Sequence, residues 1–221
     1  RLAVPTTGAI LATLLTQWQQ DPWPDVVSPD NDVPFIAAGG DPQARLGPFA
    51  IALLNVDVEV VFLPYRQPWA HGHVEAHNGV FARKLWRVRH FETRAGIDAG
   101  LTAFNTAYAA YHRAHWPVAR RLPSGFQPPP DWCWRLSQSH PRPIHFIRLV
   151  EAVPEDRASI EVLHTRIPVA PAYLHQFVLA TLDLERHPLT VAYEQDDGTL
   201  APLGEHPFSV RWPTRPSRVW Q

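Results

Sequence analysis

Hydrophobic residues near the start of the chain recur at steps of three and four, which is the spacing of one face of a helix. They are Ile10, Leu11, Leu14, Leu15 and Trp18. Thr6 and Thr7 precede this stripe and can cap the first turn, whereas Pro22 and Pro24 follow it and cannot continue a helix. The pattern therefore predicts a helix over residues 7–20.

Two segments after this helix have the composition of β-strands. The segment DVVSPDNDVPF, at residues 25–35, predicts a short strand that enters a loop rich in turn-forming residues. The segment NVDVEVVFLP, at residues 55–64, places apolar side chains from Val56 to Phe62 on one face and is rich in β-branched residues. We predict a strand here that Pro64 ends.

Helical spacing returns after the loop YRQPWAHG at residues 65–72. Two sets of apolar residues then recur at helical steps. The first set is Val74, Phe81, Leu85 and Val88, and the second set is Leu101, Phe104, Tyr108 and Tyr111. We therefore predict two consecutive helices, with Glu75 in the first turn of the first one.

The composition changes near residue 117. Residues 117–143 are rich in proline, which is typical of a stiff, extended linker. Five segments beyond it have the length and alternation of short strands. They are IHFIRLVEAV, SIEVLHTRIPV, FVLATLDL, LTVAYEQ and FSVRW, with Asp197-Gly198 as a turn signal. We predict a small all-β barrel, or a sandwich, at residues 144–215.

Charge and composition narrow the classes of function. Lys and Arg number 20 against 21 Asp and Glu, so the formal net charge of −1 gives no general affinity for polyanions. The charge is uneven, however, because residues 82–121 carry eight basic side chains and two acidic ones. The single cysteine excludes an internal disulfide and a cysteine-rich zinc site. No apolar run approaches the roughly 20 residues of a membrane span, so we expect a soluble, intracellular protein without a membrane partner.

Three histidines surround Glu75 in the stretch WAHGHVEAHNG. His73 and His77 are four residues apart, so on a helix they could bind one zinc ion together with His71, with Glu75 as the base of a hydrolase. The spacing H-x-E-x-H differs from H-E-x-x-H, which places the acid as that mechanism requires. Alternatively, these are solvated side chains at a helix start, where the helix dipole favours Glu75.

The motifs around Glu75 and upstream of it resemble a known family. PWAHGHVEAHNGVF, preceded by the strand VEVVFLP, resembles the P-x-x-x-G-x-V-E-x-x-N-x-x-F signature of integrase-like DDE transposases of insertion sequences. VVSPDNDVPF resembles the strand and the D-N-G-x-x-F motif of the same family. In this resemblance Asp30 falls on the second acidic position, Asn31 on the asparagine and Phe35 on the buried aromatic residue.

The resemblance implies an α/β fold: a partial RNase H-like integrase catalytic domain at residues 1–116, then the 117–143 linker and the 144–215 barrel. It implies DNA strand cleavage and strand transfer, with Asp30 and Glu75 as catalytic residues and metal ligands for Mg²⁺ or Mn²⁺. The chemistry agrees, because phosphoryl transfer of this kind uses two divalent ions about 4 Å apart. Carboxylates are the ligands that such hard ions prefer.

The expected partner is DNA, both transposon ends and target, on which such proteins act as homo-oligomers. Asn78 could hold a metal-bound water or a phosphate, one turn after Glu75. The basic residues that follow would lie along the DNA backbone, whose phosphates supply most non-specific affinity. These are Arg83, Lys84, Arg87 and Arg89. The expected location is the bacterial cytoplasm, in association with the nucleoid.

The chain departs from the family pattern at several positions. Asp32 stands where the family has glycine, and His71 stands where it often has asparagine. Asp30 and Glu75 are separated by 44 residues, more than in the best-known members. These differences leave the non-catalytic alternative open, in which the chain is a DNA-binding remnant or a regulator of transposition.

The first aspartate of the family precedes the helix with which this chain begins, and no residue before Asp21 is acidic. The chain also contains no methionine and begins with Arg1. We therefore expect the C-terminal portion of a transposase that is inactive by itself. The nearest other carboxylates, on Asp25, Asp32 and Asp57, are not well placed to complete the metal site.

Overall fold

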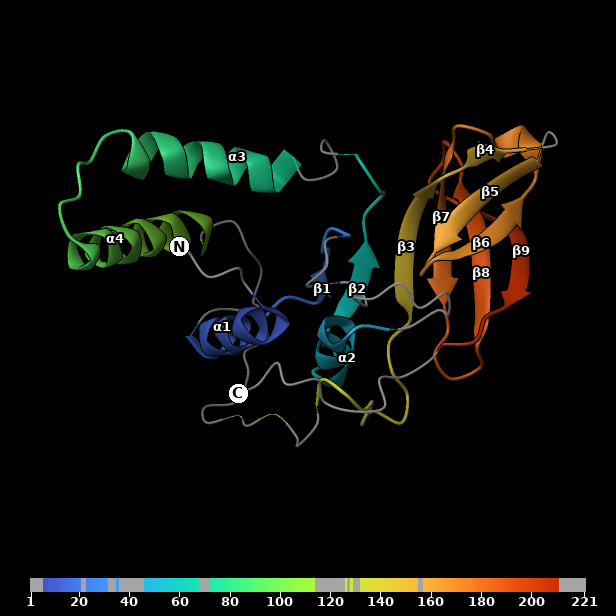
Figure 1. The fold of residues 1–221 in the computed structure, drawn as a ribbon, viewed down its shortest axis with the longest axis horizontal. Coiled ribbons are helices and arrows are strands. Elements are labelled where there is room, and N and C mark those ends of the chain that lie inside the picture. The colour runs from blue at the N-terminus through green and yellow to red at the C-terminus, as the bar shows by residue number, and fades with distance from the viewer. Residues whose placement is uncertain are drawn as a thin grey trace. The chain divides into compact units, whose positions relative to one another are not determined.

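The computed structural model describes most of the chain in two compact units (Figure 1). The described residues are 6–20, 23–31, 35, 46–67, 72–113, 126, 128, 132–154 and 157–210. The sheet unit comprises residues 1–66 and 121–221, and the helical unit comprises residues 67–120. Within the described residues, no helix is long and apolar enough to span a membrane.

A six-stranded mixed sheet forms the centre of the sheet unit, in the order β1-β2-β3-β7-β8-β9. The strands are β1 (Val26–Val27), β2 (Glu59–Phe62), β3 (Ile144–Leu149), β7 (Phe177–Leu182), β8 (Pro188–Glu194) and β9 (Leu200–Pro207). The first three strands pair in parallel, and the remaining pairs are antiparallel. The predicted α/β class is confirmed, and so are the predicted strands that contain β1 and β2.

A second, antiparallel sheet contains β4 (Glu151–Val153), β5 (Arg157–Val162) and β6 (Thr165–Val169). A short 3-10 helix, η3 (Pro171–Tyr173), leads from it back to β7. The predicted barrel is wrong, since the described strands form two open sheets. The physical reason is that β3 hydrogen-bonds to β2 on one side and to β7 on the other, so neither of its edges is available to close on β9.

Two helices belong to the sheet unit, α1 (Thr7–Gln20) and α2 (Pro48–Asn55). The structure confirms the predicted helix over residues 7–20. Sequence patterning missed α2, whose residues from Phe49 to Asn55 are all buried. A helix that is apolar on every side has no amphipathic stripe, because it lies inside the core.

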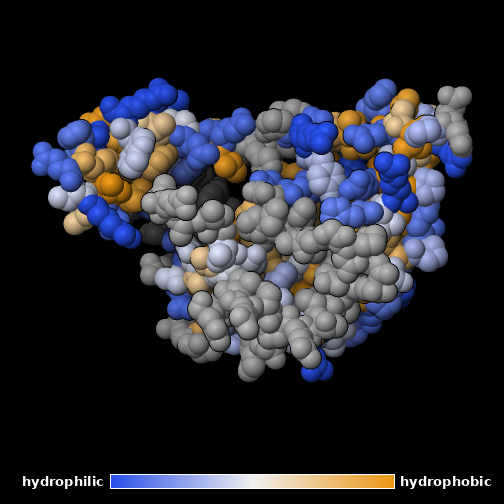
Figure 2. All heavy atoms as spheres, viewed as in Figure 1, coloured by the Kyte–Doolittle hydropathy of each residue, from blue (hydrophilic) through white to orange (hydrophobic). Residues whose placement is uncertain are grey.

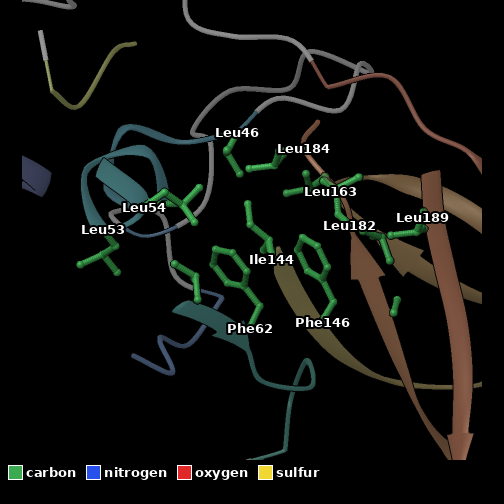
Figure 3. Close-up of a cluster of buried hydrophobic side chains, with 14 of the residues drawn as sticks. Leu46, Leu53, Leu54, Phe62, Ile144, Phe146, Leu163, Leu182, Leu184 and Leu189 are labelled. Atoms are coloured by element: carbon green, nitrogen blue, oxygen red, sulfur yellow. The ribbon is translucent and has the colours of Figure 1, made fainter. Parts of the chain in front are cut away.

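The core of the sheet unit lies between α2 and the strands. Phe62 of β2 and Phe146 of β3 are register partners, and their rings stack with centroids 5.3 Å apart (Figure 3). Leu53 and Leu54 of α2 flank this pair on one side, and Leu182 of β7 lies on the other. Because β2 and β3 are adjacent, residues on both sides of the predicted linker share one core.

Asn55 fixes the described part of the predicted linker to the end of α2. Its amide nitrogen donates to the carbonyl oxygens of Trp132 and Arg135, and its oxygen accepts from the backbone N–H and the hydroxyl of Ser137. These contacts use the full capacity of a side-chain amide, which is 6% exposed. Trp132 and Cys133 are buried, so this part of the predicted linker packs on the sheet unit and is not an extended connector.

The helical unit contains α3 (Gly72–Phe81), a π-helical turn η2 (Ala82–Trp86) and α4 (Arg94–Arg113), drawn in green in Figure 1. Both predicted helices are confirmed, with Glu75 in the first turn of α3. The two helices meet through an aromatic seam, defined as His77, Phe81, Phe104 and Tyr108. Leu85 is buried beside Gly100, where a Cβ atom would lie 3.3 Å from the Leu85 methyl group.

Candidate functional site

Asp30 follows β1 at the carboxyl end of the parallel strands and is partly buried. The loop around it is tied to the end of β2. The Leu63 N–H donates to the Pro29 carbonyl at 3.5 Å, and the Asn31 amide donates to the Leu63 carbonyl at 2.6 Å. The position of Asp30 is therefore set by the strand that leads along the chain towards Glu75.

Arg148 holds the Asp30–Asn31 loop from the side of the core. It is 2% exposed and occupies the core-facing register of β3, two residues after Phe146. Its guanidinium donates to Asn31 Oδ1 at 3.0 Å and to the Leu63 carbonyl at 2.7 Å. It also donates to the Glu161 carbonyl of β5 at 2.9 Å, so this one side chain connects the loop, β2 and the second sheet.

The hydrogen bonds of the buried Arg148 go to carbonyl and amide oxygens, aromatic rings lie beside it, and the Glu161 carboxylate acts on it electrostatically. The guanidinium lies 4.4 Å from the centroid of the Tyr65 ring and 5.3 Å from that of Phe146. Burial lowers the pKa of Arg148 from its ordinary value, and the charge and hydrogen bond of Tyr65 oppose this change. Burial likewise raises the pKa of Tyr65. Arginine remains protonated in proteins, so a positive charge lies directly behind Asn31 and favours negative charge at the loop.

Phe35 completes the D-N-x-x-x-F motif as expected. Its ring packs edge-on against Phe49 of α2, with centroids 4.8 Å apart. Phe35 is partly buried and packs against the core of the sheet unit. Asp32 lies outside the described residues.

Glu75 is exposed on α3 and faces away from α4. The ring of His77 packs on Tyr108 at 4.6 Å and on Phe104 at 6.1 Å, which identifies the side of α3 that meets α4. At about 100° per residue, Glu75 lies on the opposite side from His77. Asn78, one turn later, is also exposed.

Arg83 lies on the same face of the helix as Glu75, two turns later. Its guanidinium folds back over Gly79, where Nη1 is 3.3 Å from the place that a Cβ atom would occupy. Glu75, Gly79 and Arg83 therefore lie along one face of the helix. The Arg83 guanidinium covers the backbone at Gly79, one turn after Glu75. A side chain at position 79 would displace the Arg83 guanidinium.

The predicted basic residues surround the π-helical turn. Arg83, Lys84, Arg87 and Arg89 are all exposed, whereas Leu85 between them is buried. The Arg87 N–H donates to the Ala82 carbonyl at 2.9 Å, which closes the wide turn. These cations are therefore accessible, and their role in binding DNA stays a prediction.

A second charged cluster lies at the other end of β2. Arg142 donates to both carboxylate oxygens of Asp57, at 2.7 and 3.2 Å, and this contact raises the pKa of Arg142. His145 lies 3.4 Å from Glu59, and burial lowers its pKa more than the carboxylate raises it. Asp57 is held at the end of β2 opposite to Asp30, so it does not supply a third carboxylate to that loop, as expected.

Of the three histidines in the zinc alternative, His77 is the one whose side chain lies within the described residues. His77 packs in the aromatic seam, and the described residues contain no group of three or more His, Cys, Asp or Glu side chains that could hold a metal ion. His71 and the side chain of His73 lie outside the described residues. Asp30 belongs to the sheet unit and Glu75 to the helical unit, so their joint action on a metal stays a prediction.

Comparison of the chain with protein-family models, with curated proteins and with solved structures gives no match. The resemblance to integrase-like transposases therefore stands on the motifs alone. Sequence patterning missed Arg148 and Tyr65, although one signal was present. In IHFIRL the alternation that buries Ile144 and Phe146 also turns Arg148 inward, and a cation at a core-facing position requires polar partners.

Proposed function

We propose that this chain is part of an integrase-like insertion-sequence transposase that cleaves and joins DNA strands with Mg²⁺ or Mn²⁺. The observation that carries the proposal is the Asp30–Asn31 loop. It follows a strand that pairs in parallel with the strand leading to the Glu75 helix. In open α/β sheets, ligands bind beyond the carboxyl ends of parallel strands, which is where Asp30 lies.

The proposed roles follow from the chemistry of the side chains. Asp30 and Glu75 supply carboxylate oxygens to divalent ions that activate the attacking oxygen and stabilise the leaving oxygen. Asn31 is occupied by Arg148 and Leu63, so its role is to hold Asp30 in place. An RNase H-like arrangement of these elements, with a further carboxylate on another strand, is part of the proposal.

DNA binding is the second part of the proposal. The exposed cations around η2 support it, because phosphate contacts from Lys and Arg supply most non-specific affinity for DNA. Asn78 on α3 and Arg83 on η2 follow Glu75 by about one and about two turns, so a phosphate bound there would lie near the proposed metal ligand. The intact protein would act on transposon ends and target DNA as a homo-oligomer.

Metal binding tests the assignment without requiring catalysis. Mn²⁺ is titrated into the chain while the spectrum of free Mn²⁺ is followed by electron paramagnetic resonance. Asp30→Asn and Glu75→Gln should each weaken Mn²⁺ binding about tenfold or more, because each removes an anionic ligand. The matched control is Glu92→Gln, which removes an exposed carboxylate from the same unit as Glu75. Equal Mn²⁺ affinity in all three variants would contradict the site.

Strand cleavage tests the activity itself. A labelled duplex is incubated with Mn²⁺ and either this chain or a version extended upstream. We expect cleavage only by the extended protein, with loss of cleavage but not of DNA binding in Glu75→Gln. Cleavage by the short chain that disappears in Glu75→Gln would contradict the expected inactivity. Loss of activity only on replacing His73 and His77, with stoichiometric zinc, would support the hydrolase instead.

The runner-up is a non-catalytic DNA-binding remnant or regulator of transposition. The observation that favours it is the basic surface around η2, which requires no metal ion. DNA binding by the extended protein without any cleavage in Mg²⁺ or Mn²⁺ would select this alternative.

A further inference from the structure

Trp86 is a large aromatic side chain in an unusual setting, because it is 53% exposed and yet packs against two other aromatic rings. Its ring lies 6.0 Å from that of Phe81 and 5.6 Å from that of Phe91, measured between centroids. The Phe81 ring is nearly parallel to it, at 25°. Trp86 thus packs on two aromatic residues, and about half of its surface remains open to solvent.

The backbone around Trp86 keeps this support in place. Trp86 is the last residue of the π-helical turn η2, and π-helical turns occur frequently at functional sites. Leu85, the residue before it, is the one fully buried apolar side chain among the described residues of the helical unit. Gly100 allows α4 to lie close to Phe91, because a Cβ atom at position 100 would be 2.8 Å from the Phe91 ring.

Basic residues flank Trp86 along the chain. Arg83, Lys84, Arg87 and Arg89 lie within three residues of Trp86, and all four are exposed. No acidic residue occurs between Gly79 and Phe91. Hydrophilic and apolar side chains lie side by side over the surface of the helical unit (Figure 2). A partner for this surface must therefore supply both a flat apolar group and negative charge.

We infer that Trp86 is a stacking platform for an unpaired base of DNA, whose flanking phosphates bind the surrounding arginine and lysine side chains. This inference rests on the proposed function, because it names which DNA structure the basic surface recognises. Single-stranded nucleic acid binders combine cationic grooves with exposed aromatic rings on which bases stack. A base inside a duplex is already stacked on its neighbours, so the ligand is a single-stranded overhang or a frayed end.

The charge pattern favours this ligand over a protein partner. A protein that covered Trp86 would have to place several carboxylates against the four cations while burying the indole ring. A strand of DNA carries one phosphate per nucleotide and a π-face on every base, so it meets both requirements without a specific sequence. We therefore expect a preference for unpaired ends and little preference among bases.

The test is equilibrium binding in the presence of a chelator, which removes any contribution from catalysis. The probes are a blunt duplex and the same duplex with a short single-stranded overhang that carries 2-aminopurine, a base analogue whose fluorescence falls on stacking. The unchanged chain should bind the overhang duplex more tightly and quench the 2-aminopurine. Trp86→Ala should lose the quenching and weaken overhang binding about tenfold, with blunt-duplex affinity unchanged.

Two further variants separate stacking from folding. Trp86→Phe should retain most of the quenching, because phenylalanine keeps an aromatic face. Val88→Ala removes an exposed apolar side chain two residues away and should change nothing. Circular dichroism of each variant checks that the helices of the chain are intact.

Each other outcome contradicts the inference. Overhang binding by Trp86→Ala at full affinity would leave DNA binding intact and remove the stacking role. An equal loss for blunt and overhang duplexes would assign Trp86 to general support of the surface. Absence of binding to either probe at low salt would reject the proposed function and the stacking role together. Self-association of the chain that disappears in Trp86→Ala would assign the ring to an interface between copies.

Discussion

The two units of this protein are stabilised in different ways. The sheet unit buries large apolar side chains from two helices and two sheets in one cluster. Among the described residues of the helical unit, Leu85 is the one fully buried large apolar side chain, and the aromatic seam beside it is only partly buried. The comparison teaches that the sheet unit is held by its core. The helical unit is held by a few ring contacts and leaves its charged side chains accessible for binding.

Removing one ring from each unit should expose this difference most strongly. Phe62→Ala deletes a fully buried ring that stacks on Phe146 and should lower the free energy of unfolding by about 3–5 kcal/mol. Phe81→Ala deletes a partly buried ring of the seam and should cost about 1–2 kcal/mol. Urea unfolding followed by circular dichroism measures both. Equal losses of unfolding free energy in the two variants would show that the helical unit depends on its core as much as the sheet unit does.

The loss of stability on replacing an arginine should also differ strongly between the two units. Arg148→Met keeps the length of the side chain but deprives the Asn31 oxygen and the Leu63 carbonyl of the guanidinium donor, so we expect a loss of about 3 kcal/mol. Arg87→Met, at an exposed position of the helical unit, should change stability by less than about 0.5 kcal/mol. Urea unfolding of both variants measures the difference, and equal values would contradict the structural role of Arg148.

The Arg148 variant also sharpens the site assignment. If Arg148 positions the Asp30 loop, Arg148→Met should weaken Mn²⁺ binding under conditions where the protein is still folded. The control is Arg142→Met, which breaks the contact with Asp57 at the opposite end of β2. If Mn²⁺ affinity falls in neither the Arg148→Met nor the Arg142→Met variant, or falls equally in both, Arg148 does not position the metal site.

The pH dependence of stability should reside in the sheet unit. Burial lowers the pKa of folded His145 below its usual 6.5, so the unfolded chain takes up the proton first. Stability should therefore fall as the pH drops through 6.5 towards the folded pKa, and this loss is absent well above 6.5. His145→Asn should reduce the loss between about pH 7.5 and about pH 5, measured by urea unfolding. If stability depends on pH equally in His145→Asn and in the unchanged chain, the pH dependence comes from other groups.

Removing the basic residues of the helical unit should have the smallest effect on stability and a clear effect on binding. The quadruple alanine variant of Arg83, Lys84, Arg87 and Arg89 should unfold almost like the unchanged chain. Its dependence of log K on log salt for duplex DNA should become shallower by up to about four units, one for each phosphate that the variant no longer neutralises. The control is Arg166→Ala with Arg186→Ala, which removes exposed arginines from the sheet unit. A slope unchanged in the quadruple variant would mean that these cations are simply solvated.

Local patterns predicted the amphipathic elements well and the fully buried or irregular ones poorly. The helix over residues 7–20 and the two helices after Glu75 each present an apolar stripe, which periodicity detects. The predicted strand SIEVLHTRIPV is two strands, because Leu163 and His164 take positive φ angles of 45° and 62° in a tight turn. Neither residue is a usual signal for such a turn.

The last strand was also misplaced. The sequence predicted FSVRW, whereas β9 ends at Pro207 and residues 208–210 are not in a strand; Arg211 and Trp212 lie outside the described residues. The residues of β9 are too mixed in polarity to alternate visibly. The Asp197-Gly198 turn that precedes β9 was predicted correctly, since Gly198 has a φ of 80°. Turn residues with a strict conformational need were thus more reliable than the strand pattern beside them.

Only those residues of the candidate site that belong to local sequence motifs could be predicted. Asp30, Glu75 and the basic residues were found because their order and spacing are local features of the sequence. The hydrogen bonds of Arg148 depend on β3 lying beside β2, and residues 148 and 31 are far apart along the chain. No periodicity within either segment carries that information.

The pairing of β2 with β3 has a consequence for synthesis of the chain. These neighbouring strands are separated by the whole helical unit, so the centre of the sheet cannot close until residues 144–149 have left the ribosome. Pairings of such long sequence separation form slowly, because a large loop must be closed first. During that interval the apolar side chains of α2 and β2 lack the partners that β3 and β7 supply. A premature stop after residue 116 would make this exposure permanent, and the shortened product would be a target for proteases and aggregation rather than a minimal version of the fold.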